Sequence, residues 1–352
     1  MAFPPSSLPF LKLAHLRLVA AIAQYGQIQA AAQALALTQP AASRSLAEIE
    51  RLVGAPLFER HPRGMTPTPL GEILVRRAHT MLMGMQDLAR ELQEEREGRS
   101  GLVQAGAVTG PAVGCLVPAI RRLKALTPHV ELRIDVGPSI QLMRGLEEGD
   151  YDFIIGRLLP ESDVDAFDIV PGAIETVRCL VRSSHPLARK RNVPLAALAE
   201  HPWIIQERGM PIRQAVEAAF IHAGLPGPAD VVATSSLVLM MALLVESDMI
   251  APMSLEVARL MEGTGAGSLA VIDLAVPIEV SPYHIITYRG RGLSPAASRL
   301  HALVLEEVAR LRGDDRTAGS AYFAQQTLLR CACGALSGAP TPNGCRNHQF
   351  AS

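Results

Sequence analysis

The sequence has few aromatic residues and almost no net charge. Phenylalanine, tryptophan and tyrosine make up 4% of its 352 residues, so a stacking pocket for a sugar ring is not obvious. The formal net charge of −1 gives no sign, over the whole chain, of a polyanionic partner. Hydrophobic residues nevertheless make up 49% of the chain, which is long enough for two or three domains with sizeable cores.

Paired cysteines, an export signal and long hydrophobic runs are also lacking. An odd number of unevenly spaced cysteines does not form a disulfide framework. The first residues carry neither a basic segment nor a small-residue cleavage site, and the longest apolar run, residues 237–245, is too short to span a bilayer. We therefore expect a soluble, cytoplasmic protein with no membrane partner. The five cysteines are Cys115, Cys179, Cys331, Cys333 and Cys345.

The sequence contains none of the common catalytic or nucleotide-binding motifs. We find no Walker loop, no H-E-x-x-H and no G-x-S-x-G. The segment GTGAGS at residues 263–268 lacks the spacing of a G-x-G-x-x-G loop and follows an expected helix instead of a strand. We therefore expect that the protein is not an enzyme and that it needs neither a cofactor nor a metal.

Positive charge is concentrated in the first seventy residues. This segment carries six basic and three acidic side chains, in a chain whose remainder is negative. Such asymmetry suggests a module that binds nucleic acid or another anionic surface. A mildly basic solvated face would give the same count, so charge alone leaves the two readings open.

Three short segments in this region predict a helix-turn-helix. The spacing of apolar residues indicates helices over residues 11–25 and 28–37, followed by a third between Thr38 and Gly54. Thr38 can cap the third helix, and Pro40 fits its first turn. A tight turn before a helix with a polar start is typical of the helix-turn-helix, although an ordinary three-helix bundle shares the apolar pattern.

The polar start of the third helix and the basic hairpin after it provide candidate contacts to DNA. Gln39 can pair with adenine, Arg44 with guanine or a phosphate, and Ser43 with a phosphate. Residues 57–70 fit a β-wing, from whose tip Arg63 can enter a minor groove. The candidate DNA contacts are Thr38, Gln39, Pro40, Ala41, Ser43, Arg44, Arg60 and Arg63.

A heptad pattern follows over residues 71–98. Apolar residues alternately four and three positions apart form a seam, which is typical of a helix that pairs with a second copy. Such a dimer places two DNA-binding heads on the half-sites of an interrupted palindrome. The alternative is a helix packed on its own domain, but the polar segment 91–98 favours an exposed helix, with a hinge at residues 98–101. The seam residues are Leu74, Ala78, Met81, Met85, Leu88 and Leu92.

Residues 99–312 alternate between expected strands and helices. The β-α-β-α-β order of residues 102–155, with its first helix expected at Leu116–Leu126, predicts a parallel sheet with helices on both faces. Residues 177–272 carry a similar set. We expect two α/β lobes joined by crossing strands, with a ligand in the crevice between them. The expected lobes are lobe 1, at about 102–170 and 277–312, and lobe 2, at about 171–276.

Residues 31–71 resemble the winged helix-turn-helix of LysR-type transcriptional regulators. The family pattern is an Ala-Ala pair, a Leu, then Ser/Thr-Gln-Pro-Ala-x-Ser-Arg/Lys, Leu-Glu-x-x-Leu-Gly, Leu-Phe-x-Arg and Thr-x-x-Gly. The fixed spacing makes this match highly specific. The chain carries Ala31-Ala32, Leu35, Thr38-Gln39-Pro40-Ala41, Ser43-Arg44, Leu52-Val53-Gly54, Leu57-Phe58, Arg60, Thr68 and Gly71.

The resemblance implies a sequence-specific regulator of transcription that binds double-stranded DNA as a homodimer or homotetramer, with RNA polymerase as a candidate partner. It also implies a C-terminal effector domain of two lobes, similar to bacterial solute-binding proteins. A solute-binding protein without a regulatory role is the alternative, against which the N-terminal module speaks. One departure is Gly26-Gln27-Ile28, where many members have Ser or Thr opening the second helix. This predicts a weaker cap and puts one phosphate contact in doubt.

On this resemblance, we expect the effector to contact residues that follow strands or begin helices. Ser139 begins a helix, where free N–H groups attract anions or sugar hydroxyls, and Thr234 and Ser235 begin another helix in the second lobe. Arg157 can clamp a carboxylate. Local capping or solvation is the alternative for each residue. The chain also resembles the branch of the family that contains regulators of a galactose-binding protein and of protocatechuate degradation, which suggests a sugar or a small aromatic or organic acid. Arginine mildly favours an acid. The candidate effector contacts are Thr109, Gly110, Ser139, Gly156, Arg157, Gln206, Thr234 and Ser235.

Residues 313–352 extend beyond the usual end of the family. Three cysteines and His348 are potential zinc ligands. Their spacing is not that of a recognised zinc knuckle, and the content of Gly, Pro, Ser and Asn predicts a disordered tail.

Overall fold

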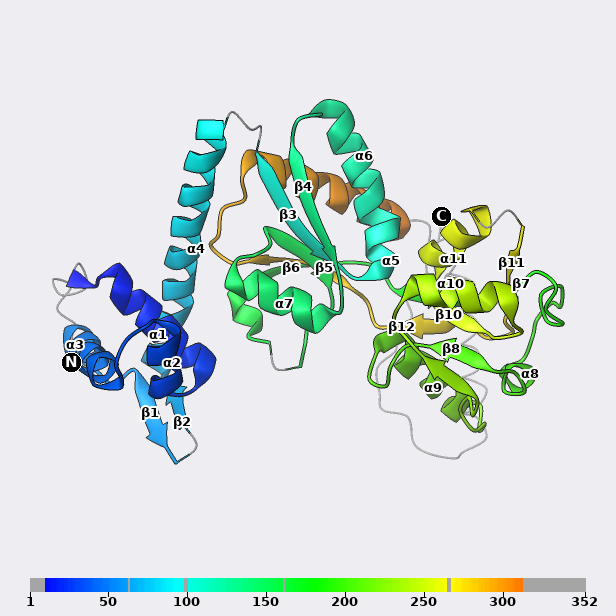
Figure 1. Ribbon diagram of the computed structural model, residues 1–352, viewed down its shortest axis with the longest axis horizontal. Helices are drawn as coiled ribbons and strands as arrows, with labels where there is room; N and C mark the ends of the chain where they lie inside the picture. The colour runs from blue at the N-terminus through cyan, green and yellow to red at the C-terminus, as the bar shows by residue number, and fades with distance from the viewer. Residues whose placement is uncertain (1–9, 63, 98–100, 161, 265–266, 313–352) are drawn as a thin grey trace, which may run out of the picture. The chain divides into compact units, whose positions relative to one another are not determined.

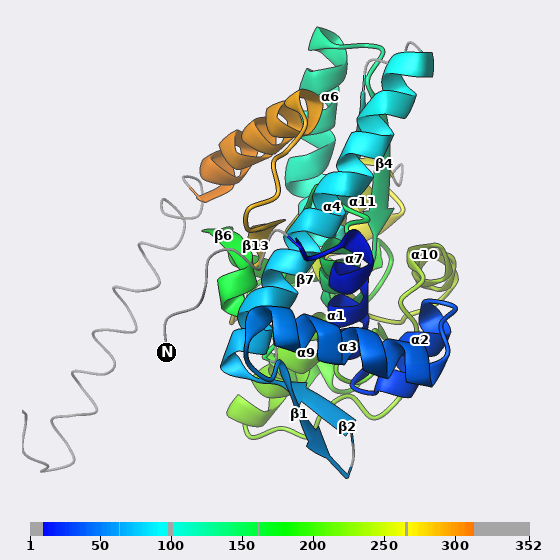
Figure 2. The same ribbon diagram turned by 90° about the vertical axis from the view of Figure 1, so that its left-hand side faces the viewer.

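The computed structural model describes residues 10–62, 64–97, 101–160, 162–264 and 267–312 (Figure 1). The N-terminal part is a winged helix-turn-helix, as predicted, in which apolar side chains from three helices and a hairpin form one buried core. Figure 2 shows the antiparallel hairpin extending from the three helices. Its elements are α1 (Leu13–Tyr25), α2 (Ile28–Ala34), α3 (Gln39–Val53), β1 (Phe58–His61), β2 (Gly64–Pro67) and the long helix α4 (Pro69–Glu97).

The ends of the first three helices follow from local sequence. Gly26 ends α1 and Gly54 ends α3, each in the left-handed conformation, with φ of 64° and 81°. The Thr38 hydroxyl accepts a hydrogen bond from the Ala41 N–H at 3.4 Å and so caps α3. Gln27, at the corresponding position of α2, makes no such bond with its side chain. The predicted caps of α3, and the weaker cap of α2, are confirmed.

Two glycines allow the hairpin to pack closely against its neighbours. Gly64 has a φ of 145°, and a Cβ there would overlap the Gly26 carbonyl oxygen. That same oxygen accepts the Met65 N–H at 2.7 Å, which ties β2 to the end of α1. A Cβ at Gly71 would overlap the carbonyl oxygen of Leu57. The wing is therefore held by backbone contacts to the helices on both sides.

The heptad seam of α4 divides into two parts. Leu74 packs against the core of the three helices, and Ala78 is 0% exposed, because α1 packs against α4. These two residues therefore belong to the chain's own core, which corrects the predicted seam at its first two positions. The other four seam residues keep roughly half of their surface exposed: Met81, Met85, Leu88 and Leu92.

Lobe 1 is built on a five-stranded sheet in the order β4-β3-β5-β13-β6. Helix α7 packs on strands β3, β5 and β13, and a helix over residues 295–312 places His301 against Phe153 of β5, with ring centroids 5.3 Å apart (orange in Figure 1). The elements are β3 (Leu102–Ala107), α5 (Thr109–Pro111), a π-helical turn (Ala112–Leu116), α6 (Val117–Leu126), β4 (Glu131–Val136), α7 (Ser139–Glu148), β5 (Phe153–Gly156), β6 (Phe167–Pro171) and β13 (His284–Tyr288).

Lobe 2 is centred on the long strand β7, which pairs antiparallel with three shorter strands. A second, parallel pair joins β8 to β9. The elements are β7 (Glu175–Arg182), α8 (Leu195–Leu198), β8 (Trp203–Ile205), α9 (Pro211–His222), β9 (Val231–Ala233), α10 (Leu237–Glu246), β10 (Ala251–Ser254), α11 (Leu255–Thr264), β11 (Leu269–Val271) and β12 (Ile278–Val280).

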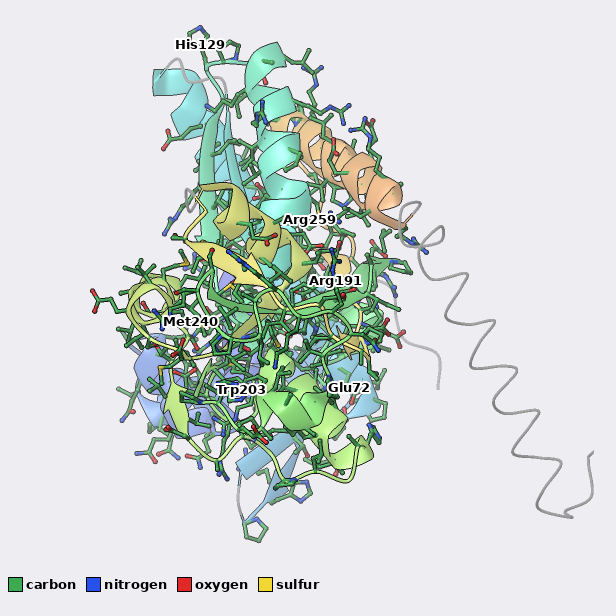
Figure 3. The ribbon with its side chains drawn as sticks, turned by 90° about the vertical axis from the view of Figure 1, so that its right-hand side faces the viewer. Glu72, His129, Arg191, Trp203, Met240 and Arg259 are labelled. Atoms are coloured by element: carbon green, nitrogen blue, oxygen red, sulfur yellow. The ribbon has the colours of Figure 1, made fainter. Side chains whose placement is uncertain are left out.

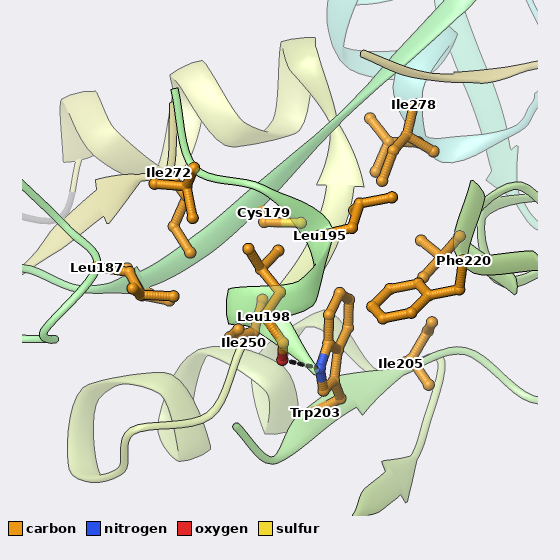
Figure 4. Packing of buried hydrophobic residues seen from close by; sticks show 14 of the residues in the cluster. Cys179, Leu187, Leu195, Leu198, Trp203, Ile205, Phe220, Ile250, Ile272 and Ile278 are labelled. Carbon is orange, nitrogen blue, oxygen red and sulfur yellow. Dashed lines mark hydrogen bonds between the residues drawn. The ribbon is translucent and has the colours of Figure 1, made fainter. Parts of the chain in front are cut away.

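The core of lobe 2 is organised around the single tryptophan. Trp203 is fully buried, donates its Nε1–H to the Leu198 carbonyl at 3.1 Å, and meets Phe220 edge to face at 5.8 Å (Figure 4). Trp203 and Met240, labelled in Figure 3, belong to different buried clusters of this lobe. The two clusters hold β8 between α9 and α10.

Three expectations for the lobes need correction. The predicted parallel sheet holds for β3, β4 and β5, but β13 runs antiparallel between β5 and β6, and β7 has only antiparallel neighbours among the described strands. Strands β6, β11 and β12 were not expected at all. The helix predicted to begin near Leu116 already begins at Thr109, so Thr109 and Gly110 lie in its first turn. Among the described residues, no helix is both long and apolar enough to cross a membrane.

Candidate DNA interface and effector site

The start of α3 presents polar side chains on an exposed surface. The side chains of Gln39 and Arg44 are exposed, and neither forms a hydrogen bond or ion pair within the described part of the chain. Ala42, Leu46 and Ile49 are buried on the opposite side of the helix, which fixes its rotation. The helix therefore offers an amide and a guanidinium that are free to bind a partner.

The remaining candidate DNA contacts differ in their surroundings. Thr38 and Pro40 are exposed and form the start of α3, where the Thr38 hydroxyl is occupied by its capping bond. Ala41 and Ser43 are half-buried. Arg60 is exposed on β1, while Arg63 lies outside the described residues.

Two anchors of this surface were not predicted from the sequence. The Glu50 carboxylate accepts the Leu57 N–H at 2.9 Å, which fixes the chain between α3 and the wing. The Thr68 hydroxyl donates to the Pro56 carbonyl at 2.9 Å and accepts the Gly71 N–H at 3.1 Å. These bonds explain why a Thr-x-x-Gly sequence follows the wing: the threonine caps α4, and the glycine allows the close approach to Leu57.

Four of the candidate effector residues come together in lobe 1. The Ser139 hydroxyl accepts the Arg157 N–H at 3.0 Å, and a Cβ at Gly156 would lie 3.3 Å from the same hydroxyl oxygen. The Arg157 guanidinium donates to the Ser281 carbonyl at 3.0 Å and forms an ion pair with Glu175. Gly110 lies on the other side of that carboxylate, because a Cβ at Gly110 would overlap the Glu175 Oε1.

Three candidates come together in lobe 2, at the carboxyl ends of β8 and β9. The Thr234 N–H bonds to the Ile205 carbonyl at 2.9 Å, which places Gln206 and Thr234 beside each other at this edge. The Thr234 hydroxyl accepts the Ser236 N–H at 3.1 Å, and Ser235 donates to Glu207. Helix α10 begins after these residues and is capped by Ser236, which corrects the expectation that Thr234 and Ser235 begin it.

Glu175 and His284 are functional candidates that sequence reasoning missed. Glu175 is 4% exposed, a strong sign of a specific role because a buried carboxylate needs a partner. His284 follows the loop that carries Ser281 and pairs with Gly156 across β13 and β5. Burial and, secondly, the charge of Arg157 lower the pKa of His284. A carboxylate at the first position of β7 was the only sequence signal for Glu175.

A buried thiol and phenol lie near Glu175. The Tyr283 hydroxyl and the Cys115 Sγ are 3.4 Å apart. Burial raises the pKa of Cys115 to about 11 and raises that of Tyr283 as well. Both groups therefore stay protonated near neutral pH, and Cys115 lacks the thiolate character of a reactive cysteine.

A surface pocket of about 410 Å³ lies beside α9 in lobe 2. None of the eight candidate effector residues lines it, so it does not coincide with either group of candidates. The described residues contain no group of three or more His, Cys, Asp or Glu side chains arranged to hold a metal ion. The cysteine-containing segment 313–352 lies outside the described residues.

Both parts of the chain match known protein families. Residues 13–72 match the bacterial regulatory helix-turn-helix protein, lysR family, and residues 96–309 match the LysR substrate binding domain. Together they include both the α3 surface and the two groups of candidate effector residues.

Curated relatives and solved structures agree with this match. The chain is 40% identical over 267 residues to the HTH-type transcriptional regulator GbpR of Rhizobium radiobacter, covering 75% of this chain and 86% of the relative. It is 35% identical over 288 residues to GbpR of Azospirillum brasilense, covering 82% and 84%. Full-length OxyR of Pseudomonas aeruginosa has the same fold, with a TM-score of 0.54 at 21% identity, covering 84% of this chain and 94% of that one. The chain therefore belongs to the LysR family of bacterial transcriptional regulators, oligomeric DNA-binding proteins that respond to small-molecule effectors.

Proposed function

We propose that two copies of the chain bind an interrupted palindrome through α3 and the wing, and that an effector held between the two lobes changes this complex. The observation that carries the proposal is the exposed, unengaged pair of Gln39 and Arg44 on a helix whose rotation is fixed by its buried side. Side chains that pair with base edges in the major groove need this combination of exposure and rigid support.

Each candidate DNA contact has a distinct role in this proposal. Gln39 pairs with adenine, and Arg44 pairs with guanine or a phosphate. Ser43 bonds a phosphate, and Arg60 and Arg63 hold the wing against the backbone or in the minor groove. Thr38, Pro40 and Ala41 shape the start of α3, as the capping bond of Thr38 indicates.

Dimerisation is assigned to the exposed part of α4. Its stripe consists of Met81, Met85, Leu88 and Leu92, which follow one another at spacings of four and three. Gly84 lies on the same part of the helix, and a Cβ there would meet nothing within 4 Å. An exposed apolar stripe of this length on a polar helix is best explained by a second copy of the helix. A homotetramer built from two such dimers, and contact with RNA polymerase, extend the proposal.

The effector is assigned to the two groups of strand-end residues, in lobe 1 and in lobe 2. The relatives of the chain include regulators named GbpR, GalR and PcaQ. The effector that we propose is a sugar or a small aromatic or organic acid. We also propose that the protein acts in the cytoplasm and performs no catalysis.

The test is DNA binding by the full-length chain to a duplex that it selects from a random pool. Gln39→Ala and Arg44→Ala should each weaken binding to the selected site by about 1–3 kcal/mol, the usual value of a bidentate base contact. Arg51→Ala is the matched control, because Arg51 is an exposed cation in the last turn of the same helix. It should lower affinity for selected and random duplexes alike. Unchanged site preference in both α3 variants would contradict the proposal.

A further inference from the structure

The ion pair between Arg157 and Glu175 changes the expected chemistry of the effector site. From sequence, Arg157 is a candidate clamp for a carboxylate. In the structure, its guanidinium already binds the Glu175 carboxylate and the Ser281 carbonyl. The Arg157 and Glu175 side chains are 12% and 5% exposed, so bulk water solvates neither charge and each depends on the other as its partner. The chain thus supplies the anion that a carboxylate ligand would have supplied.

The position of Glu175 is built into the surrounding backbone. Only a glycine at position 110 leaves room for its carboxylate, since a Cβ there would overlap Oε1. The neighbouring side chain of Ser254 closes the same space, with its hydroxyl 2.9 Å from that hypothetical Cβ. Strand β12 holds the backbone of Glu175 through its pairing with Val280. Glu175 therefore has little freedom to move aside for a competing anion.

Other charges near the candidate residues do not favour an anion either. Burial keeps His284 neutral by lowering its pKa, with a smaller effect from Arg157. In lobe 2, the bond from Ser235 lowers the pKa of Glu207, so this carboxylate stays ionised. Arg213 is occupied by Glu217 at 2.8 Å and by the Gln206 carbonyl at 3.1 Å. The charges around the two groups therefore balance, with Arg157 against Glu175 in lobe 1, and Arg213 and the exposed Arg208 against Glu217 and Glu207 in lobe 2.

Three buried polar atoms at these groups lack a hydrogen-bond partner among the described residues. They are Gln206 Oε1, His284 Nδ1 and, beside Gly110, Ser254 Oγ. An amide oxygen can only accept a hydrogen bond, so its partner must be a donor. An ionised carboxylate offers acceptors only, whereas a sugar hydroxyl both donates and accepts. A buried acceptor without a partner is costly, so Gln206 favours a ligand that brings a donor. The imidazole Nδ1 and the serine hydroxyl can each accept or donate, which suits the hydroxyls of a sugar.

We propose that Glu175 is a specificity-determining residue, which makes the effector site select an uncharged, hydroxyl-rich ligand over a carboxylate. This inference rests on the proposed effector site. Glu175 fills the position beside Arg157 and repels a second anion, while the remaining hydroxyl, amide and imidazole groups bind hydroxyls of the ligand. Removal of its charge, with its shape kept, should open the site to carboxylates.

The test uses the full-length chain and matched sets of hexose, hexuronate and hexosamine built on glucose, galactose and mannose. Members of a set share one ring and differ in a carboxylate or an ammonium. Calorimetric titration should show that the wild type binds a neutral hexose more tightly than its uronate by about tenfold or more, the worth of roughly one charged hydrogen bond. In Glu175→Gln this ratio should fall by about tenfold or reverse.

Two further variants separate specificity from damage to the fold. Glu306→Gln removes one carboxylate of another Arg–Glu pair, Arg122–Glu306, which touches neither group of candidate residues, and should leave the ratio unchanged. The double variant Arg157→Gln with Glu175→Gln removes both charges and should again prefer the neutral hexose. If Glu175→Gln does not fold, the preference of the wild type and of the double variant still decides the matter.

Several outcomes would overturn the inference. The first is that the wild type binds a uronate or a hexosamine as tightly as the neutral hexose, or more tightly. The second is that the ratio of hexose to uronate affinity stays unchanged in Glu175→Gln. The third is that no neutral hexose of the three sets binds. A small carboxylate that binds the wild type and alters its DNA complex would overturn this inference and leave the proposed function standing. A neutral hexose that binds without any effect on the DNA complex would contradict the proposed function and leave this inference standing.

Discussion

Gly71→Ala should destabilise the DNA-binding module, although Ala favours helices. Gly71 lies in the first turn of α4, where an added Cβ would overlap the Leu57 carbonyl oxygen and lie 3.0 Å from its carbonyl carbon. Both obstructing atoms belong to the backbone of a residue that is 0% exposed. They cannot move aside as a flexible side chain can, so the wing and α4 must separate.

The expected change in the free energy of unfolding combines two destabilising terms and one stabilising term. Overpacking of this kind costs about 1–3 kcal/mol. The displaced Leu57 carbonyl accepts the Thr68 N–H at 2.9 Å, and the loss of that bond costs about 1 kcal/mol. Replacing glycine with alanine in a helix returns at most about 1 kcal/mol. The net expectation is a destabilisation of about 1–3 kcal/mol.

Gly84→Ala is the matched control, because it adds the same methyl group to the same helix in open space. It should stabilise α4 by up to about 1 kcal/mol. Amide hydrogen exchange in α3, β1 and β2 of the full-length chain measures both effects locally. Faster exchange in Gly71→Ala, together with weaker binding to the selected duplex, is the expected result. Equal protection in the two variants would refute the reasoning from backbone overlap.

The other predictions concern the cap, the dimer and a buried thiol. Thr38→Ala removes the oxygen that accepts the Ala41 N–H and should cost α3 about 1 kcal/mol, seen as faster amide exchange, whereas Thr38→Ser should retain most of the stability. Met81→Glu with Leu88→Glu should shift sedimentation of the chain toward the monomer, and a Met81→Leu, Leu88→Met control should not; an unchanged dimer would rule out this part of α4. The pKa of Cys115 is raised from 9.0 to about 11, so the folded state binds its proton more tightly. Stability should therefore fall as pH rises from 9 to 11, and peptide-resolved alkylation below that range should be slow unless the chain is unfolded.

The features that could be predicted from sequence are those set by residues close together in the chain. The helix ends at Gly26 and Gly54 and the cap at Thr38 depend on groups within about four positions, so their residue types are sufficient evidence. The same holds for the exposed start of α3, whose polar side chains precede a regular apolar spacing. The ends of β5, β8 and β9 could also be located, because each is a short apolar run followed by a polar residue or ending in a glycine.

The direction of strands could not be obtained in the same way. An alternating pattern specifies which side chains are buried but not which neighbour a strand pairs with. Strand β13 comes from far along the chain and inserts antiparallel between β5 and β6. Likewise, Leu74 and Ala78 fit a dimer seam by spacing, but α1 packs against this part of α4 and they contribute to the chain's own core.

The sequence by itself determined that Arg157 follows a buried strand, and it therefore identified a cation at a ligand-binding edge. Only the tertiary structure decided what that cation does. Glu175 lies eighteen residues away at the start of another strand, and folding brings its carboxylate to the guanidinium in the space left open by Gly110. The electrostatic potential that a ligand meets is the sum of contributions from groups that can be distant in the chain. In a buried site, the nearest charged group dominates that sum.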